Sequence, residues 1–235
     1  MPSQSDTENL TSDLLNRFTI VTGKGGVGKS TVVALLALLG VSRGCRTLLI
    51  ELNSDGQAAR FLGHSPSNGE VKHLEDTLWT VNIRPPMALQ EYGLMKLKFR
   101  TFYRLVFENS LVRALVQFVP GLNDLVMLGK AFNHERELDD QNQPLWDLII
   151  IDAPATGHSL TFFKLPKVIR DVVPSGNMHR ETDEMWTLLC DQERTTIHLV
   201  AIPEELPVQE TLELSHELTT VLGLPLGHVI LNRCP

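Results

Sequence analysis

A glycine-rich stretch near the start of the chain has the residue types and spacing of a phosphate-binding loop. It reads G-K-G-G-V-G-K-S-T and matches the pattern G-x-x-x-x-G-K-[ST]. Glycines allow consecutive backbone N–H groups to close on phosphate oxygens without a Cβ in the way. Lys29 is expected to neutralise the β- and γ-phosphates, and the Ser30 hydroxyl to ligate Mg²⁺. The predicted nucleotide-binding residues are Gly23, Lys24, Gly25, Gly26, Val27, Gly28, Lys29, Ser30 and Thr31.

The segments around this loop predict the elements that would position it. Residues 18–22 are typical of a short buried strand, and the apolar run at 32–41 suits a helix that ends before Gly44. A second strand is expected at 47–51. Strand, loop, helix and strand in this order form a βαβ unit, which predicts an α/β fold with a parallel sheet.

A second candidate site residue ends the clearest buried strand. Residues 148–151 are apolar and are followed by Asp152. A carboxylate at the carboxyl end of such a strand lies where it can hold Mg²⁺ and its water beside a phosphate loop. Ser30 and Asp152 are therefore the predicted metal residues. Further strands are expected at 79–83, 197–202 and 229–232.

Two stretches give the chain a family resemblance. Lys24, directly after the first glycine, is the mark of the deviant, signature-lysine form of the loop, and Asp152 begins D-A-P-A-T-G-H. Together they resemble the family of arsenite-pump ATPases and tail-anchored-protein targeting ATPases. The resemblance implies a doubly wound, mostly parallel sheet of the P-loop NTPase type and a homodimer that hydrolyses Mg²⁺-ATP. It also implies that Lys24 reaches the nucleotide of the partner subunit and that 152–158 is a switch loop.

Weaker similarities extend over the rest of the chain. Residues 120–130 and 203–211 resemble stretches of the same branch, although 203–211 also reads as an acidic loop and helix start with Glu210 and Glu213 favouring its N-terminus. Asn232 and Arg233 match the position where family members contact adenine.

The chain departs from the family pattern at the expected water-orienting aspartate. Asn53 stands at that position, and an asparagine can hold a water but cannot accept its proton. Asp55 could substitute if the loop shifts, and Glu51 could serve the metal region instead. The predicted catalytic set is therefore Lys24, Lys29, Asn53 and Asp55, with slow hydrolysis. The chain also lacks the cysteine cluster and C-x-x-C site of family members, which argues against metalloid export.

The expected organisation is a disordered lead-in over 1–17 and a P-loop ATPase domain over 18–235, C-terminally incomplete because the chain stops directly after a strand. Residues 87–132 show apolar residues at helical spacing and predict a helical insertion or cap. A packed cap is favoured over a client groove. Residues that could line such a groove are Met95, Phe99, Phe102, Phe107, Phe118 and Met127. The polar stretch 134–143 is expected to be a solvated loop.

Composition excludes several classes of function. The 235-residue chain has a net charge of −7 and no basic stripe, which argues against a nucleic-acid partner. Its 3 cysteines are far apart, which argues against a disulfide framework and suits the cytoplasm. No apolar run is long enough for an integral membrane segment.

The function expected from these features is a dimeric Mg²⁺-ATPase that couples its nucleotide state to an unidentified protein client. One alternative is a nucleotide-binding regulator with little hydrolysis, which Asn53 favours. The other is a MinD/ParA-like positioning ATPase. That reading requires an amphipathic membrane helix or a basic DNA-binding patch, and the sequence has neither.

Overall fold

The computed structural model describes residues 14–84 and 122–234, which build one seven-stranded sheet. Its strands are β1 (Phe18–Gly23), β2 (Thr47–Leu52), β3 (Lys72–Glu75), β4 (Leu78–Ile83), β5 (Leu148–Ala155), β6 (Thr195–Ala201) and β7 (Leu226–Leu231). Their spatial order is β3-β4-β2-β5-β1-β6-β7, and only the β3–β4 pair is antiparallel. The doubly wound, mostly parallel α/β fold expected from the sequence is confirmed.

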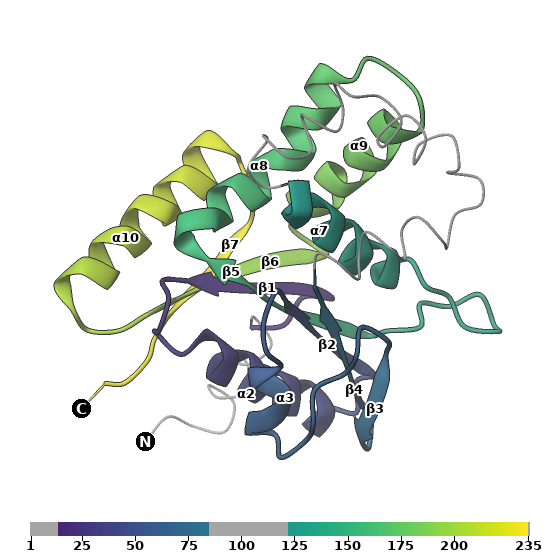
Figure 1. Cartoon of the computed structure of the whole chain (residues 1–235), viewed down its shortest axis with the longest axis vertical. Helices are drawn as coiled ribbons and strands as arrows, with labels where there is room; N and C mark the ends of the chain where they lie inside the picture. Colours follow the sequence, from purple (N-terminus) through teal and green to yellow (C-terminus); the bar gives the residue numbers. More distant parts are fainter. Residues whose placement is uncertain (1–13, 85–121, 235) are drawn as a thin grey trace.

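Helices cover both faces of this sheet (Figure 1). On one face lie α2 (Lys29–Ser42) and α3 (Gln57–Phe61). On the other lie α7 (Leu122–Glu135), α8 (Thr156–Val172), α9 (Asn177–Cys190), α10 (Glu205–His216) and the π-helical turn η2 (Glu217–Val221). Because every central strand is buried on both faces, its residues are apolar almost without alternation, as in the strand β5.

Two apolar cores hold the layers together. The larger one packs α7, α8, α9 and η2 on the sheet around side chains such as Ile20, Ile50 and Phe162, each 0% exposed. The smaller one packs α2 and α3 on the opposite face around Val33, Leu49 and similar residues. The helix α2 is thereby fixed beneath the sheet with its first residue beside the glycine-rich loop.

The structure differs from the sequence predictions in three places. Strand β3 was not expected; it forms an antiparallel hairpin with β4 at the sheet edge. The segment 152–158 is not a loop, because β5 continues to Ala155 and α8 begins at Thr156. The extension of β5 follows from its pairing with β1: Gly23 lies opposite Ala155, and the Thr22 hydroxyl donates to the Pro154 carbonyl at 2.9 Å.

The third difference concerns the polar stretch 134–143, whose first two residues belong to α7 and are buried, whereas no helix or strand forms over 136–143. Glu135 is 2% exposed because its carboxylate pairs with two guanidinium groups, Arg17 at 3.1 Å and Arg194 at shorter range. These pairs join α7 to the starts of β1 and β6. A charged residue can be buried in this way when its charge is paired, and here both partners come from distant parts of the chain.

Other predictions lie partly outside the described residues. Those residues exclude most of the lead-in and, of the helical stretch 87–132, all of 87–121. Of the candidate groove residues, only Met127 is described, and it is 0% exposed within the larger core. Within 14–84 and 122–234, no helix is long and apolar enough to cross a membrane.

Candidate functional site

The glycine-rich loop connects the carboxyl end of β1 to α2, in the arrangement that the sequence predicts. A Cβ on Gly23 would overlap the carbonyl oxygen of Val200 on the neighbouring strand, so the loop can leave the sheet only through a glycine. Gly28, at φ 93°, caps α2 in the left-handed region. The hydrogen bonds of α2 begin with Thr31 and Val32, which both donate to the Gly28 carbonyl.

The N-terminus of α2 is free to hold an anion. No side chain caps it, and its first turn contains no acidic residue. The N–H groups of Lys29 and Ser30 precede the first bonded ones, so they have no acceptor among the described residues. Unpaired N–H groups and the partial positive charge of the helix end favour a phosphate at this position.

The predicted metal residues lie in direct contact. The Ser30 hydroxyl donates to Oδ2 of Asp152 at 2.6 Å. Burial raises the pKa of Asp152, although the Ser30 hydrogen bond and the charge of Lys29 oppose this. Burial has the opposite effect on the cation: it lowers the pKa of Lys29, and the charge of Asp152 opposes this. The Asp152 carboxylate and the Lys29 ammonium therefore lie in a partly desolvated environment. A charged ligand that enters it would interact with them more strongly than in water.

The donor set fits Mg²⁺ in the presence of a phosphate. A hydroxyl and a carboxylate are hard oxygen ligands, and magnesium is usually bound by one or two protein groups with substrate phosphates and water. Within the described part of the chain, no three His, Cys, Asp or Glu side chains lie together as a metal cluster. Ser30 and Asp152 would hold the ion, which supplies charge neutralisation to the phosphates when it is bound.

Lys29 and Lys24 each bind a group of this same chain. The ammonium of Lys29 donates to the carbonyl oxygen of Lys24 at 3.2 Å, within the loop itself. The ammonium of Lys24 pairs with Oε1 of Glu210, on α10, at 2.9 Å. The acidic residue in the first turn of α10 is Glu205, and Glu210 lies further along the helix. The expectation that Glu210 favours the helix N-terminus is therefore wrong.

The carboxylate closest to the metal residues on the next strand is Glu51. It is 0% exposed and lies opposite Asp152 in the β2–β5 register. Its Oε1 accepts the N–H of Ala58 at 2.8 Å, and Oε2 that of Ala59 at 3.4 Å, so it anchors the start of α3. Burial raises the pKa of Glu51, against the effect of these hydrogen bonds. A glutamate in the last two positions of an otherwise apolar strand is the sequence signal for this residue.

The two residues predicted for hydrolysis lie in the loop that Glu51 anchors. Asn53 is exposed, in the left-handed region at φ 50°, and its N–H donates to the Ile83 carbonyl at 2.9 Å. The Asp55 side chain is 78% exposed and pairs with Arg84 at 3.0 Å. In this conformation, the Asp55 carboxylate is engaged by the end of β4.

The two residues predicted for adenine contact follow β7. Asn232 donates from Nδ2 to the Val27 carbonyl at 2.8 Å, and its backbone N–H donates to the Ala201 carbonyl. Arg233 is exposed, with φ 55°. A Cβ on Gly28 would overlap Nδ2 of Asn232, so this contact with the loop depends on a glycine at position 28.

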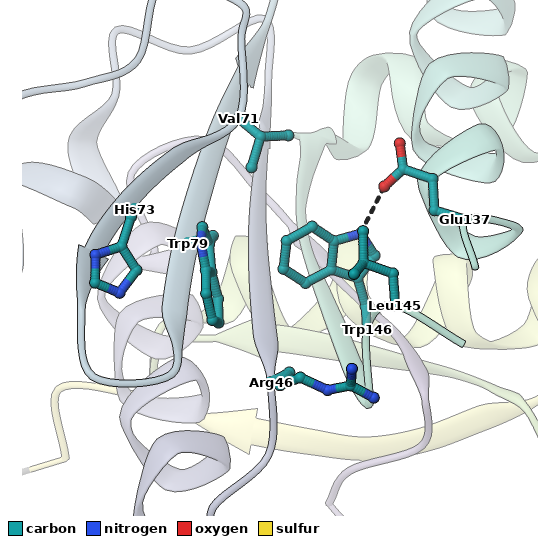
Figure 2. A pocket seen from close by; sticks show the side chains of 7 residues that line it. All are labelled: Arg46, Val71, His73, Trp79, Glu137, Leu145 and Trp146. Carbon is teal, nitrogen blue, oxygen red and sulfur yellow. Dashed lines mark hydrogen bonds between the residues drawn. The ribbon is translucent and has the colours of Figure 1, made fainter. Parts of the chain in front are cut away.

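A hollow near the opposite ends of the strands is separate from this site (Figure 2). Trp79 and Trp146 form one part of it, with ring centroids 5.3 Å apart in an edge-to-face arrangement. Several of its polar groups have partners, such as Trp146 Nε1, which donates to Glu137 at 2.8 Å. Ligands of parallel sheets bind at the carboxyl ends of strands, so this hollow is not the nucleotide site. It is lined by Arg46, Val71, His73, Trp79, Glu137, Leu145 and Trp146.

The geometry of the loop, helix and carboxylate agrees with comparisons to known proteins. Residues 16–180 match the profile of the family described as anion-transporting ATPase. The chain belongs to this family. The match confirms the resemblance that the signature-lysine loop and the stretch after Asp152 indicate.

Individual relatives of the chain are named as ATPases. ATPase BagA of Mycobacterium tuberculosis is 34% identical over 92% of this chain, and the match covers 65% of that relative's length. The ATPase ASNA1 homolog of Entamoeba dispar is 25% identical over 95% of the chain and 78% of the relative. ATPase ASNA1 homolog 1 of Paramecium tetraurelia is 23% identical over 96% and 77%. The chain thus spans less than two thirds of the length of the most similar of these three.

Proposed function

We propose that this chain binds and hydrolyses Mg²⁺-ATP as a homodimer and couples its nucleotide state to a protein partner. The observation that carries the proposal is the 2.6 Å hydrogen bond between Ser30 and Asp152, at the N-terminus of a helix that has no side-chain cap. It brings a metal-binding pair to a position where backbone N–H groups can bind phosphate. The naming of the relatives as ATPases supports the same activity.

Each residue has a role that follows from its position. The N–H groups of the loop and of Lys29 and Ser30 bind the phosphates, and the Lys29 ammonium exchanges the Lys24 carbonyl for a phosphate oxygen. Ser30 and Asp152 hold the metal. Lys24 stabilises the charge that develops on the transferred phosphoryl group of a second copy, as an arginine finger does.

The positions of Asn53, Asn232 and Arg233 complete the proposed site. Asn53 orients the attacking water from the loop after β2, without accepting its proton. Asn232 and Arg233 lie against the base, because they follow β7 beside the glycine-rich loop and Asn232 already touches that loop. The absence of a carboxylate at position 53 implies slow turnover.

The proposal is tested by light scattering after size-exclusion chromatography and by steady-state hydrolysis, with and without Mg²⁺-ATP. Wild type is expected to dimerise with ATP and to hydrolyse it, and Lys24→Ala is expected to lose turnover by 10²-fold or more. Lys72→Ala is the matched control, because Lys72 is a lysine on β3 whose hydrogen bonds within the described residues go to Ser65. A wild-type monomer that binds ATP without turnover, and is unaffected by Lys24→Ala, refutes the proposal.

A second candidate function is a nucleotide-binding switch with little hydrolysis. It is favoured by Asn53, which cannot accept a proton, and by the pairing of Asp55 with Arg84, which directs that carboxylate to the end of β4. The Asn53→Asp variant separates the two functions in the same hydrolysis assay. A gain in turnover supports a slow ATPase, and unchanged, negligible turnover in both proteins supports the switch.

A further inference from the structure

Lys24 and Glu210 form an ion pair between two elements that both border the proposed nucleotide site. Lys24 belongs to the loop after β1, and Glu210 lies in α10, which follows β6. The strands β1 and β6 are neighbours in the sheet, so their carboxyl ends bring the two residues together. The separation of Nζ and Oε1 is 2.9 Å, and the two side chains are 28% and 33% exposed.

This contact conflicts with the role proposed for Lys24 in a dimer. To stabilise a phosphoryl group on a second copy, the ammonium must carry an uncompensated positive charge and extend away from its own chain. In the described conformation, it is directed instead to a carboxylate of its own α10. A carboxylate at hydrogen-bond distance offsets the charge that would attract the partner's phosphates.

We propose that Glu210 is a positioning residue that restrains Lys24 within its own subunit, so that the ion pair must break before Lys24 can reach a second copy. This inference rests on the proposed function, since it requires a nucleotide-dependent dimer. The pair is partly exposed, and exposed pairs are weak in general. Their strength corresponds to a two- to fivefold change in an equilibrium constant, which is suited to a restraint that ATP binding overcomes.

The test compares Glu210→Gln with Glu213→Gln. Glutamine keeps the shape of Glu210 and removes its charge. Glu213 is an exposed glutamate one turn further along α10, whose described contact is with Gln209, so its variant controls for the loss of one negative charge on this helix. Dimer dissociation constants are measured by sedimentation in saturating Mg²⁺-ATP, and turnover is measured in parallel.

Because each subunit of the dimer breaks one such pair, the two effects multiply, and Glu210→Gln is expected to tighten the ATP-bound dimer about 4- to 25-fold relative to Glu213→Gln. The gain should disappear in the background of Lys24→Ala, because it acts through that ammonium. Equal dimer affinity in the two variants, or a weaker dimer in Glu210→Gln, overturns the inference. A weaker dimer would mean that Glu210 orients Lys24 toward the partner or contacts it.

A measurement without nucleotide separates failure of this inference from failure of the proposed function. Acetylation of Lys24 by acetic anhydride, followed by peptide mass spectrometry, reports whether its ammonium is held by Glu210. Faster acetylation in Glu210→Gln than in Glu213→Gln is expected, and equal rates overturn the inference, whatever the dimer does. If wild type never dimerises with ATP, the proposed function fails. In that case faster acetylation in Glu210→Gln would still show the ion pair, but the pair would not restrain a dimer.

Discussion

The buried histidine His198 makes the free energy of unfolding depend on pH. His198 lies on β6 and is 0% exposed. Its Nδ1 accepts the N–H of His228 at 2.9 Å, and Nε2 donates to the Leu14 carbonyl at 2.9 Å. Burial lowers the pKa of His198, with the nearby His228 ring acting in the same direction and the hydrogen bonds opposing. The neutral ring therefore completes the β6–β7 pairing where the register shifts.

The sign of the effect follows from proton counting. In the unfolded chain, His198 binds a proton near pH 6.5, whereas in the folded chain it does so only at lower pH. Below neutrality the unfolded state holds more protons, so the free energy of unfolding falls as the pH falls. The contribution of this residue lost between pH 7.5 and pH 5.5 is at most about 1.4 kcal/mol. It corresponds to about 3 to 6 °C in Tm for a chain of this size.

The His198→Gln variant isolates this contribution from those of the other histidines. At pH 7.5, it is expected to be about 1 to 3 kcal/mol less stable than wild type, because it removes a buried ring that accepts the part-buried N–H of His228 and donates to the Leu14 carbonyl. At pH 5.5 the gap should shrink by up to about 1.4 kcal/mol. Urea unfolding at both pH values measures it, with His216→Gln as a control for an exposed histidine. A gap that is constant or grows toward pH 5.5 refutes the reasoning.

Two other variants test the site and its support. Ser30→Ala should weaken Mg²⁺-ATP binding about tenfold or more, while binding of Mg²⁺-free ATP changes less, because the hydroxyl is a metal ligand; calorimetric titration with and without Mg²⁺ measures this. Equal losses in both titrations would contradict the metal role. Glu135→Gln should lower the free energy of unfolding by about 1 to 3 kcal/mol, because it removes the charge of a buried carboxylate that accepts hydrogen bonds from two partly exposed guanidinium groups. Glu184→Gln, which breaks an exposed pair, should change it by less than about 1 kcal/mol in the same urea titration.

Sequence reasoning identified the elements whose signal is local. The loop pattern, the apolar run of α2 and the strand before Asp152 each carry a complete local signature, and these are the elements that position the candidate site. Strand β3 was not predicted because it is short, half-exposed and antiparallel. Helix α8 was not predicted because Pro166 interrupts its helical pattern. Helix α9 was not predicted because its residues are mostly polar.

The remaining site contacts depend on residues far apart in the sequence. Local patterns could not indicate that Lys24 pairs with Glu210, or that Asn232 reaches the Val27 carbonyl, because both contacts arise when the sheet brings distant strand ends together. The burial of Glu135 escaped for the same reason, since its two arginine partners come from the starts of other strands.

The contact between Asn232 and the glycine-rich loop has a consequence for how this chain can change over evolution. The space that Asn232 Nδ2 fills is the space that a Cβ at position 28 would need. The two positions are therefore sterically coupled across the sheet. Because Gly28 also lies at φ 93°, which glycine adopts without strain, a substitution there meets two obstacles, the clash with Asn232 and the backbone conformation. Replacing Asn232 by a shorter residue removes only the first of them, so position 28 stays confined to glycine.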